Sequence, residues 1–346
     1  MFYQFIDDHF SNQFISKQVR NCRRARCRST QRLVEVIPKT STSNSDNAHS
    51  SVAVILVIHR QTDFEIDSIL DQINALSWPN SKVYLLVNEP DRKLLVSQPS
   101  TVVISAGQNL GFCGGVNMAA AQAAADGCDY LLLLNLDIKI LSADLIERLM
   151  LVFAQRNDCG FVCPGIVMWP DTSEVWFRGG RILRPLWQTR AKHIGSRWRD
   201  TSRGIVATDF FNGCCALIRL STFLQLGGFD ERLFMYYDEA DLSSRGDAEG
   251  FKCYLLDEPL IAHIKEGKKF NANEAYFHAR NPRILVRLNE RGIRRLLGQF
   301  GQYVVAPRQI ARCNSKSARK AYFKGLRTDV DWATKKWESQ DRQVLD

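Results

Sequence analysis

Short apolar runs alternate with polar segments along the chain from about residue 51 onward. The clearest runs, residues 52–58 and 131–134, are too short for helices and are bounded by polar residues. Such runs are typical of strands that are buried on both faces inside a parallel sheet. After the first run, apolar residues recur at helical spacing at Ile66, Ile69, Leu70 and Ile73. This alternation predicts an α/β domain with a largely parallel sheet.

Weaker patterns extend the prediction along the rest of the chain. Further strands are predicted at 83–87, 102–104, 160–164, 210–218, 251–256 and 259–263, and further helices at 118–125 and 145–154. Residues 170–208 are polar and rich in Arg and Trp. Their apolar residues follow neither the helical spacing nor the alternation of a strand. We interpret this segment as a flexible substrate loop.

The ends of the chain are more basic than its body. Residues 1–50 carry eight Lys/Arg against four Asp/Glu, and residues 283–346 carry fifteen against six, within a formal net charge of +9. Such flanks suggest contact with lipid head groups or nucleic acid, although solvated surface charge is an alternative. We expect a basic, disordered segment at 1–50, an α/β domain at 51–282 and a basic helical region at 283–346.

The ten cysteines are spaced in no pattern that indicates a disulfide framework or a zinc site. Several lie in apolar runs, which fits buried thiols in a reducing compartment. The first residues lack a charged region followed by an apolar core, and no apolar run reaches about 18 residues. We therefore expect no secretory signal and no membrane span, and a cytoplasmic location.

An acidic residue follows the apolar run 131–134 almost directly, in the sequence Asn135-Leu136-Asp137. A carboxylate at the tip of a buried strand is costly unless a cation or hydrogen-bond donors meet it. Ligands of open α/β sheets also gather at the carboxyl ends of the strands. Asp137 is therefore a candidate metal or substrate ligand, and the alternative is that it caps the next turn.

A glycine cluster at 109–117, Asn-Leu-Gly-Phe-Cys-Gly-Gly-Val-Asn, precedes an alanine-rich helical segment. Glycines that follow a strand and open a helix let the backbone approach a phosphate, whose charge the helix N-terminus favours. A dinucleotide-dependent oxidoreductase is an alternative, and Asp137 stands where its acid about 20 residues later would fall. The spacing, however, is not G-x-G-x-x-G.

Three acids lie within four positions at Asp238, Glu239 and Asp241. On a helix, Asp238, Asp241 and Arg245 would share one face, while Glu239 points elsewhere. The acids could simply complement a helix N-terminus. The preceding aromatic residues instead suggest a carboxylate in a partly apolar cleft, which raises its pKa and suits a general base.

Two further features stand in the C-terminal half. His263 ends a strand-like run as Asp137 does, which makes it a candidate ligand or a structural histidine. Residues 282–305 place five arginines on what would be one face of a basic amphipathic helix: Arg283, Arg287, Arg291, Arg294 and Arg295. Such a helix indicates attachment to anionic lipid, unless its apolar side packs on the domain.

In this order, the motifs resemble those of the family 2 glycosyltransferases, in particular the rhamnosyltransferase-like branch of bacterial polysaccharide enzymes. The resemblance covers about residues 51–330. Its specific parts are 109–117, LLLNLDI at 132–138, the block 212–245, PLIAH at 259–263 and RN at 280–281.

The resemblance implies a GT-A type nucleotide-sugar fold with a mixed, mostly parallel sheet flanked by helices. It implies a Mg²⁺ or Mn²⁺ site at Asp137 and His263, and a catalytic base at Glu239, or at Asp238 if the helix is turned slightly. The family wraps the nucleotide at positions that correspond to Asn109, Gly111, Gly115, Asn117 and Asn135.

The implied activity is an inverting transfer of a sugar from a nucleoside diphosphate donor to a hydroxyl of a saccharide or lipid-linked acceptor. The implied setting is cell-surface polysaccharide synthesis, with peripheral contact at the inner face of the membrane and no nucleic acid. A non-enzymatic nucleic-acid-binding protein that uses the basic ends is a rival reading.

Some positions depart from the family pattern. Glu239 stands where Asp is usual, and its extra methylene could shift the base by about 1 Å. The usual acid after the second strand is missing or replaced by Glu89, and the first strand ends at His59-Arg60. A catalytically impaired, glycosyltransferase-like binding protein is therefore also an alternative.

Overall fold

The computed structural model describes residues 50–94, 101–199, 204–264 and 269–330. The predictions for residues 1–49 and 331–346 lie outside them. Among the described residues, all eight cysteines are buried and free, as expected. No helix in these four stretches is long and apolar enough to cross a membrane.

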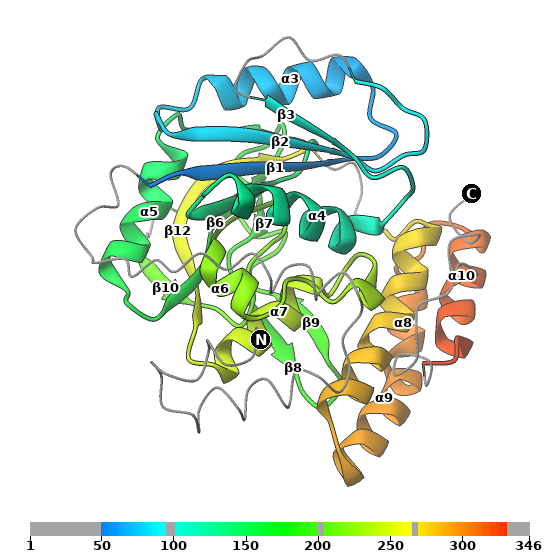
Figure 1. Ribbon diagram of the computed structural model, residues 1–346. Helices are drawn as coiled ribbons and strands as arrows, with labels where there is room; N and C mark the ends of the chain where they lie inside the picture. The colour runs from blue at the N-terminus through cyan, green and yellow to red at the C-terminus, as the bar shows by residue number, and fades with distance from the viewer. Residues whose placement is uncertain (1–49, 95–100, 200–203, 265–268, 331–346) are drawn as a thin grey trace, which may run out of the picture.

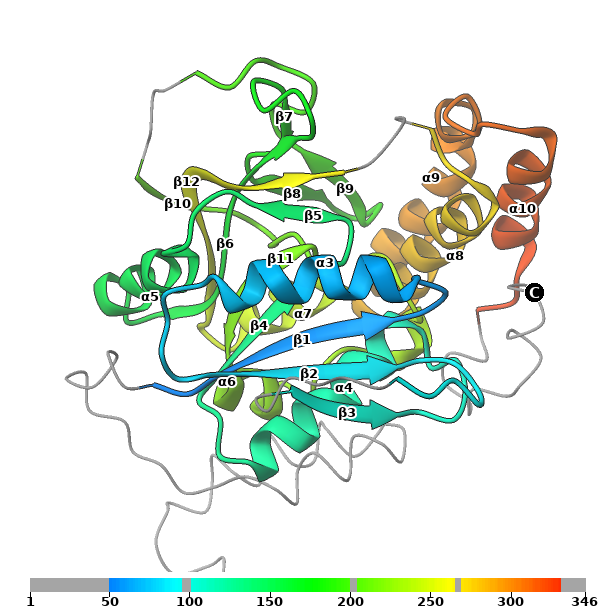
Figure 2. The ribbon, with the colours of Figure 1, turned by 90° about the horizontal axis from the view of Figure 1, so that it is seen from above.

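One large mixed sheet runs through the molecule (Figures 1 and 2). Its strand order is β10-β12-β6-β11-β4-β1-β2-β3, with β5 (Ile138–Ile140) paired to β12 and β7 (Val175–Phe177) to β6. The strands on this path are β1 (Val52–Ile58), β2 (Ser81–Val87), β3 (Thr101–Ser105), β4 (Tyr130–Leu134), β6 (Cys159–Met168), β10 (Ile205–Ala207), β11 (Cys215–Arg219) and β12 (Lys252–His263). Strands β1 to β4 lie parallel, whereas β11 runs antiparallel to β4 and β6. The predicted mixed sheet flanked by helices is confirmed.

Helices α3 (Asp63–Asn74) and α4 (Gly111–Ala125) cover opposite faces of the sheet at β1 and β2 (Figures 1 and 2). Helix α3 buries the four isoleucine and leucine residues that its sequence period predicted, and Thr62 and Glu65 form a capping box at its start. The remaining helices of the α/β part are α5 (Leu145–Gln155), α6 (Leu220–Gln225), the short 3₁₀ helix η2 (Glu231–Leu233) and α7 (Asp238–Ala248).

The prediction of a flexible loop at 170–208 is wrong for the described part of that segment. It contains strands β7 (Val175–Phe177), β8 (Gly180–Leu183), β9 (Gln188–Ala191) and β10. Its Arg and Trp residues, which made it look solvated, are partly internal: Trp187 is buried, and Arg178 pairs with Asp257 inside the protein. The strands predicted at 251–256 and 259–263 are likewise one strand, β12, with irregular register near Pro259.

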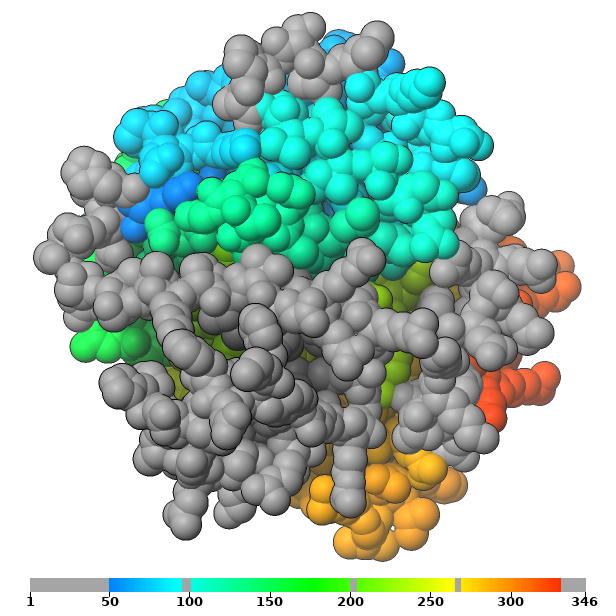
Figure 3. Space-filling model, in the orientation of Figure 1, coloured from blue at the N-terminus to red at the C-terminus, as the bar shows by residue number. Residues whose placement is uncertain are grey.

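Three helices follow the sheet: α8 (Ala272–Asn289), α9 (Gly292–Ile310) and α10 (Lys316–Arg327). Helix α9 stands at the lower margin of the molecule (Figures 1 and 3). The prediction of a single basic helix over 282–305 is wrong, because the chain breaks at Glu290 and Arg291. Two of its arginines make intramolecular contacts. Arg283 donates to the carbonyls of Gly325 and Thr328, and Arg294 pairs with Glu290.

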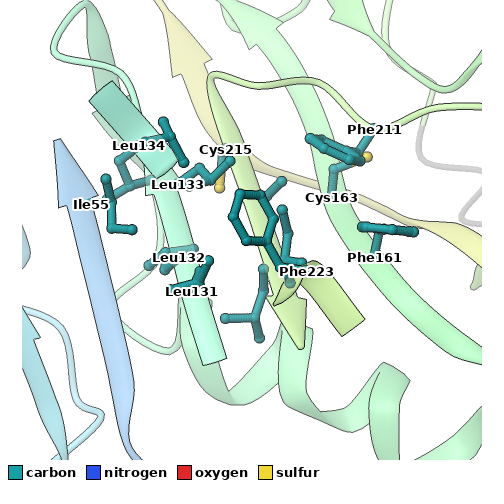
Figure 4. Packing of buried hydrophobic residues seen from close by; sticks show 14 of the residues in the cluster. Ile55, Leu131, Leu132, Leu133, Leu134, Phe161, Cys163, Phe211, Cys215 and Phe223 are labelled. Carbon is teal, nitrogen blue, oxygen red and sulfur yellow. The ribbon is translucent and has the colours of Figure 1, made fainter. Parts of the chain in front are cut away.

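The core is centred on β4, which is paired on both sides. Figure 4 shows its four leucines, Leu131 to Leu134, between Ile55 of β1 and Cys215 of β11. Each leucine is at most 2% exposed, and burying such a side chain contributes about 1.5–3 kcal/mol. The end of β4 is thereby fixed in space, and the polar residues that follow it emerge at a defined edge of the sheet.

Candidate active site

Strand β5 (Ile138–Ile140) turns back after β4 and pairs antiparallel with β12. Ile138 lies opposite His263, the last residue of β12. The backbone around Asp137 is held at both ends, because Asn135 donates its N–H to the carbonyl of Cys214 at 3.0 Å and Ile264 donates to the carbonyl of Asp137 at 2.8 Å. Two segments far apart in sequence thus bring both predicted metal residues to one edge of the sheet.

The side chains of these two residues face each other. His263 Nε2 lies 3.6 Å from Asp137 Oδ2, and the histidine side chain is 7% exposed whereas the aspartate side chain is 52% exposed. The indole of Trp176 stacks on the imidazole, with ring centroids 4.6 Å apart and planes 25° from parallel. The imidazole is therefore held in place while the carboxylate reaches solvent.

This pair suits a hard divalent cation that takes oxygen ligands and one imidazole. The described residues contain no group of three or more His, Cys, Asp or Glu placed to hold a metal ion. Mg²⁺ sites in nucleotide enzymes often use one or two protein carboxylates and fill the remaining positions with water and substrate phosphates. A two-residue set at this edge fits that kind of site.

Helix α7 begins directly after a tight turn in which three non-glycine residues have positive φ: Phe234 (65°), Tyr236 (65°) and Tyr237 (68°). Such conformations cost free energy and persist only where the surroundings enforce them. Asn281 of α8 does so, because its amide donates to the carbonyls of Leu233, Met235 and Tyr236 at 2.8–3.0 Å.

Arg280 of α8 supports the same turn. Its guanidinium donates to the carbonyls of Arg232 and Leu233, and both Arg280 and Asn281 are fully buried. Arg280 and Asn281, which form one of the motifs in the family resemblance, therefore position the acidic start of α7. The role of this pair could not be predicted from the sequence, because its partners lie more than 40 residues upstream.

The two acids at the start of α7 have different surroundings. Asp238 is 1% exposed, and its Oδ2 has no hydrogen-bond partner among the described residues. Burial, and then the charge of the adjacent Glu239, raises the pKa of Asp238 well above its ordinary value. Glu239 is half-buried and accepts a hydrogen bond from the N–H of Gly213 at 3.1 Å. Burial also raises the pKa of Glu239, although backbone N–H donors oppose the shift.

The third acid, Asp241, has a structural partner. As predicted for one helix face, Asp241 and Arg245 meet, at 2.7 Å. Arg245 also donates to the carbonyls of Leu226 and Gly228, at 2.7 and 2.8 Å. This pair ties α7 to the turn after α6, so we assign it to the fold rather than to chemistry.

The edge of the sheet that carries Asp137 and His263 is connected to the acids of α7 by one intervening segment. The segment that contains Gly213 and Cys214 contacts Glu239 on one side and Asn135 on the other. Burial raises the pKa of Tyr236, and the carboxylates of Glu274, Asp137 and Glu239 raise it further. Tyr236 is thus a further candidate site residue, for which its place among aromatic residues before the acids is a signal in the sequence.

The glycine cluster lies inside α4 rather than before it. Gly111, the first residue of the helix, has φ +70°, and a Cβ there would stand 2.5 Å from the carbonyl oxygen of Phe234. A Cβ at Gly115 would meet Leu86 Cδ2 at 2.5 Å. Gly115 thus lets α4 pack closely on β2, which is not the glycine loop that precedes the helix in a dinucleotide fingerprint.

The asparagines that flank the cluster make internal hydrogen bonds. Asn117 is buried and bonds both the N–H and the C=O of Phe229 at 2.9 Å. Asn109 accepts from the N–H of Gly111 at 2.9 Å and from the amide of Asn88 at 3.1 Å. Asn88, the residue after β2, also bonds the carbonyl of Gly111 and the N–H of Leu110, and it therefore fixes the entry to α4. Nucleotide binding by this region stays a prediction.

Comparison with known proteins gives no match to any family model. Over 202 residues the chain is 29% identical to the galactofuranosyltransferase GlfT1 of Mycobacterium tuberculosis, a match that covers 56% of this chain and 64% of the relative. Over 183 residues it is 27% identical to the N-acetylglucosaminyl-diphospho-decaprenol L-rhamnosyltransferase of the same species, covering 48% and 59%. Each match thus spans less than two thirds of the relative.

Among solved structures, the chain is similar to GalNAc-T7, which was crystallised with UDP, GalNAc and Mn²⁺. The TM-score is 0.55 at 10% identity, over 97% of this chain and 67% of the other. At this identity the likeness concerns the fold alone. Together with the relatives, it confirms the resemblance to GT2-like glycosyltransferases with the GT-A fold.

Proposed function

We propose that this chain is a metal-dependent, inverting glycosyltransferase that moves a sugar from a nucleoside diphosphate donor to a hydroxyl of a saccharide or lipid-linked acceptor. The observation that carries the proposal is the convergence of Asp137, His263 and Glu239 from three separate elements at one edge of the sheet. The names of the two relatives, a galactofuranosyltransferase and a decaprenol-linked rhamnosyltransferase, support it.

Asp137 and His263 would hold the cation, Mg²⁺ or Mn²⁺. When bound, such a cation neutralises charge on the two phosphates of the leaving nucleoside diphosphate. The described contacts support the role of the histidine as a fixed ligand, since Trp176 stacks on its ring. The solvent-exposed carboxylate of Asp137 remains able to meet a donor at the sheet edge.

Glu239 is the group that we assign as general base. In an inverting displacement, the base takes the proton of the acceptor hydroxyl while its oxygen bonds to the anomeric carbon and the bond to the diphosphate breaks. Glu239 is accessible and anchored by Gly213, whereas Asp238 is closed off from solvent. This difference supports the choice of Glu239 over its neighbour.

The proposed setting is the cytoplasmic side of a membrane, with peripheral contact and without nucleic acid. A lipid-linked acceptor is suggested by the name of the rhamnosyltransferase relative, which contains a decaprenol carrier. The binding of nucleotide by Asn109, Gly111, Gly115, Asn117 and Asn135 is part of the same proposal. Asn109 lies just before α4 and Asn135 directly after β4.

The test is calorimetric titration of the full chain with nucleoside diphosphates and nucleotide sugars in the presence of Mn²⁺. We expect Mn²⁺-dependent binding that Asp137→Ala abolishes while the variant stays folded by circular dichroism. Unchanged Mn²⁺-dependent binding by Asp137→Ala would remove Asp137 from the site. Binding of nicotinamide nucleotides in place of nucleoside diphosphates would instead favour the oxidoreductase alternative.

A further inference from the structure

Helix α9 carries its large apolar side chains on the side that faces away from the fold. Six of them are more than half exposed: Ile293 68%, Leu296 67%, Leu297 55%, Phe300 70%, Tyr303 54% and Val304 66%. They recur at spacings of three and four residues, so they form one stripe along the helix, which we call the α9 face. A contiguous apolar stripe of this kind is unusual on a soluble monomer and marks an interaction surface.

The opposite side of α9 holds the helix in this orientation. Its buried residues are small or polar: Gly298, Gly301, Gln302 and Ala306. A Cβ at Gly301 would stand 2.0 Å from Leu186 Cδ2, and one at Gly298 would stand 2.7 Å from the carbonyl oxygen of Pro185. Because a side chain at Gly298 would meet the backbone of Pro185, α9 cannot turn its larger side chains inward without losing this packing. The exposure of the α9 face is therefore built into the fold.

The charge around the α9 face identifies its occupant. Residues 269–330 carry fourteen Lys/Arg and three Asp/Glu. The α9 face itself contains no charged residue, and the exposed Arg291 and Arg308 stand near the two ends of the helix. An apolar stripe with aromatic residues, bordered by arginine, matches the head-group boundary of an anionic bilayer, which accepts apolar side chains and attracts cations.

We propose that the α9 face inserts into the head-group region of an anionic lipid bilayer, with the surrounding basic residues near the lipid phosphates. This differs from attachment through an arginine face, because the apolar side chains enter the bilayer and the arginines border them. The inference rests on the proposed function in one respect: attachment to the bilayer would bring the candidate active site to an acceptor that is carried on a lipid.

Contacts connect the α9 face to the candidate active site. Gln188 of β9 donates to Gln302 at 2.8 Å and accepts from Gln309 at 3.0 Å, so it is tied to α9 at two points. The hydroxyl of Tyr237, the residue before Asp238, donates to Gln188 at 3.5 Å. A bilayer bound at α9 would therefore stand at a fixed distance from the start of α7, where Glu239 lies.

The experiment is cosedimentation of the full chain with vesicles of phosphatidylcholine that contain increasing fractions of phosphatidylglycerol. We expect binding that rises with the anionic fraction and weakens with salt. Phe300→Glu should weaken it by about tenfold or more, because it removes a large apolar side chain and adds a repelled charge. The matched control is Phe64→Glu in α3, where the phenylalanine is 82% exposed; this variant should bind as the unchanged protein does.

Three results would overturn the proposal: no cosedimentation at any anionic fraction, equal loss in both variants, or a stable dimer that Phe300→Glu dissociates without changing vesicle binding. The last would make the α9 face a contact between two copies. Ile293→Glu serves as a second variant if Phe300→Glu does not fold, as judged by circular dichroism. Binding of nucleoside diphosphate to the protein in the presence of Mn²⁺ is measured in a separate titration. A failure of the proposed transfer function would appear there and would leave the vesicle-binding result unchanged.

Discussion

Asp238 and Glu239 are neighbours in sequence, but helix geometry sends their side chains into different surroundings. Asp238 lies in the interior with an oxygen that no described residue bonds, and burial raises the pKa of this carboxyl well above its ordinary value. Glu239 keeps contact with solvent and with the N–H of Gly213. At the scale of single residues, position on the helix separates a structural acid from a candidate base.

We predict that Glu239→Gln lowers kcat by about 10² or more, which is the usual scale for loss of a general base, with little change in donor affinity. Because burial raises the pKa of Glu239, its ionised form should appear only above the ordinary range of glutamate. The rate should therefore rise with pH through this raised pKa, and the rise should vanish in Glu239→Gln. Steady-state rates across pH, with donor affinity from calorimetry, measure both effects.

The matched variant is Asp238→Asn, which changes the adjacent acid in the same way. It should retain most of the activity, since Asp238 is 1% exposed and is expected to be protonated. Loss of activity in Asp238→Asn with retention in Glu239→Gln would show that the base has been assigned to the wrong member of the pair.

Trp176 is the second residue with a testable role. We predict that Trp176→Ala weakens Mn²⁺ binding about 10–100-fold, because groups that orient a metal-binding histidine typically contribute on this scale. Trp176→Phe should retain most of the affinity, since it preserves a ring over His263. Mn²⁺ titration followed by calorimetry measures the difference. Equal affinity in all three proteins would mean that stacking does not orient a metal ligand.

At the scale of elements, α8 positions the start of α7. The turn before α7 contains three non-glycine residues with positive φ, and the buried amide of Asn281 bonds three of its carbonyls. The free energy stored in such a turn is offset by these bonds. The placement of Glu239 thus depends on a helix more than 30 residues downstream.

We predict that Asn281→Ala lowers the free energy of unfolding by about 2–4 kcal/mol, because buried carbonyls lose their donor. It should also lower turnover more than donor affinity, since Glu239 would be displaced whereas Asp137 and His263 would stay in place. Asn289→Ala is the matched control on the same helix, because exposed Asn289 makes one bond, to Leu285. Urea unfolding and steady-state kinetics compare the two. A similar small loss in both would contradict the role of Asn281.

Strands and helices whose apolar residues repeat at a regular spacing could be predicted from the sequence. Features that depend on contacts between distant residues could not. The run Val52–Ile58 and the leucines of β4 are apolar enough to identify buried strands unaided. Asp137 and His263 could be named as candidate ligands because each ends or follows such a run. Trp176 and Asn281 could not be named from the sequence, because their contacts with His263 and with the turn before α7 join residues far apart in the chain. The break between α8 and α9 was missed because the apolar pattern continues through it.

At the scale of the whole molecule, the polar segment after β6 belongs to the packed fold. Its composition resembles a loop, yet Arg178 is 8% exposed and Asp257 of β12 is 1% exposed where they pair, at 2.5 Å. Trp198 covers the guanidinium, with its ring centroid 4.3 Å away. Composition could not predict this arrangement, because an arginine is buried only where the fold supplies specific partners for its guanidinium, here the carboxylate of Asp257.

We predict that Asp257→Ala lowers the free energy of unfolding by about 3–5 kcal/mol, because it leaves the Arg178 guanidinium buried without its carboxylate. The double variant Arg178→Met/Asp257→Leu should recover most of this loss, since it removes both charges. Asp247→Ala is the control: its partner Lys252 is exposed, and exposed pairs contribute about 0–1 kcal/mol. Denaturant unfolding measures stability, and limited proteolysis between residues 170 and 199 should accelerate only in Asp257→Ala. Equal stability of Asp257→Ala and Asp247→Ala would mean that this segment is not held by the buried pair.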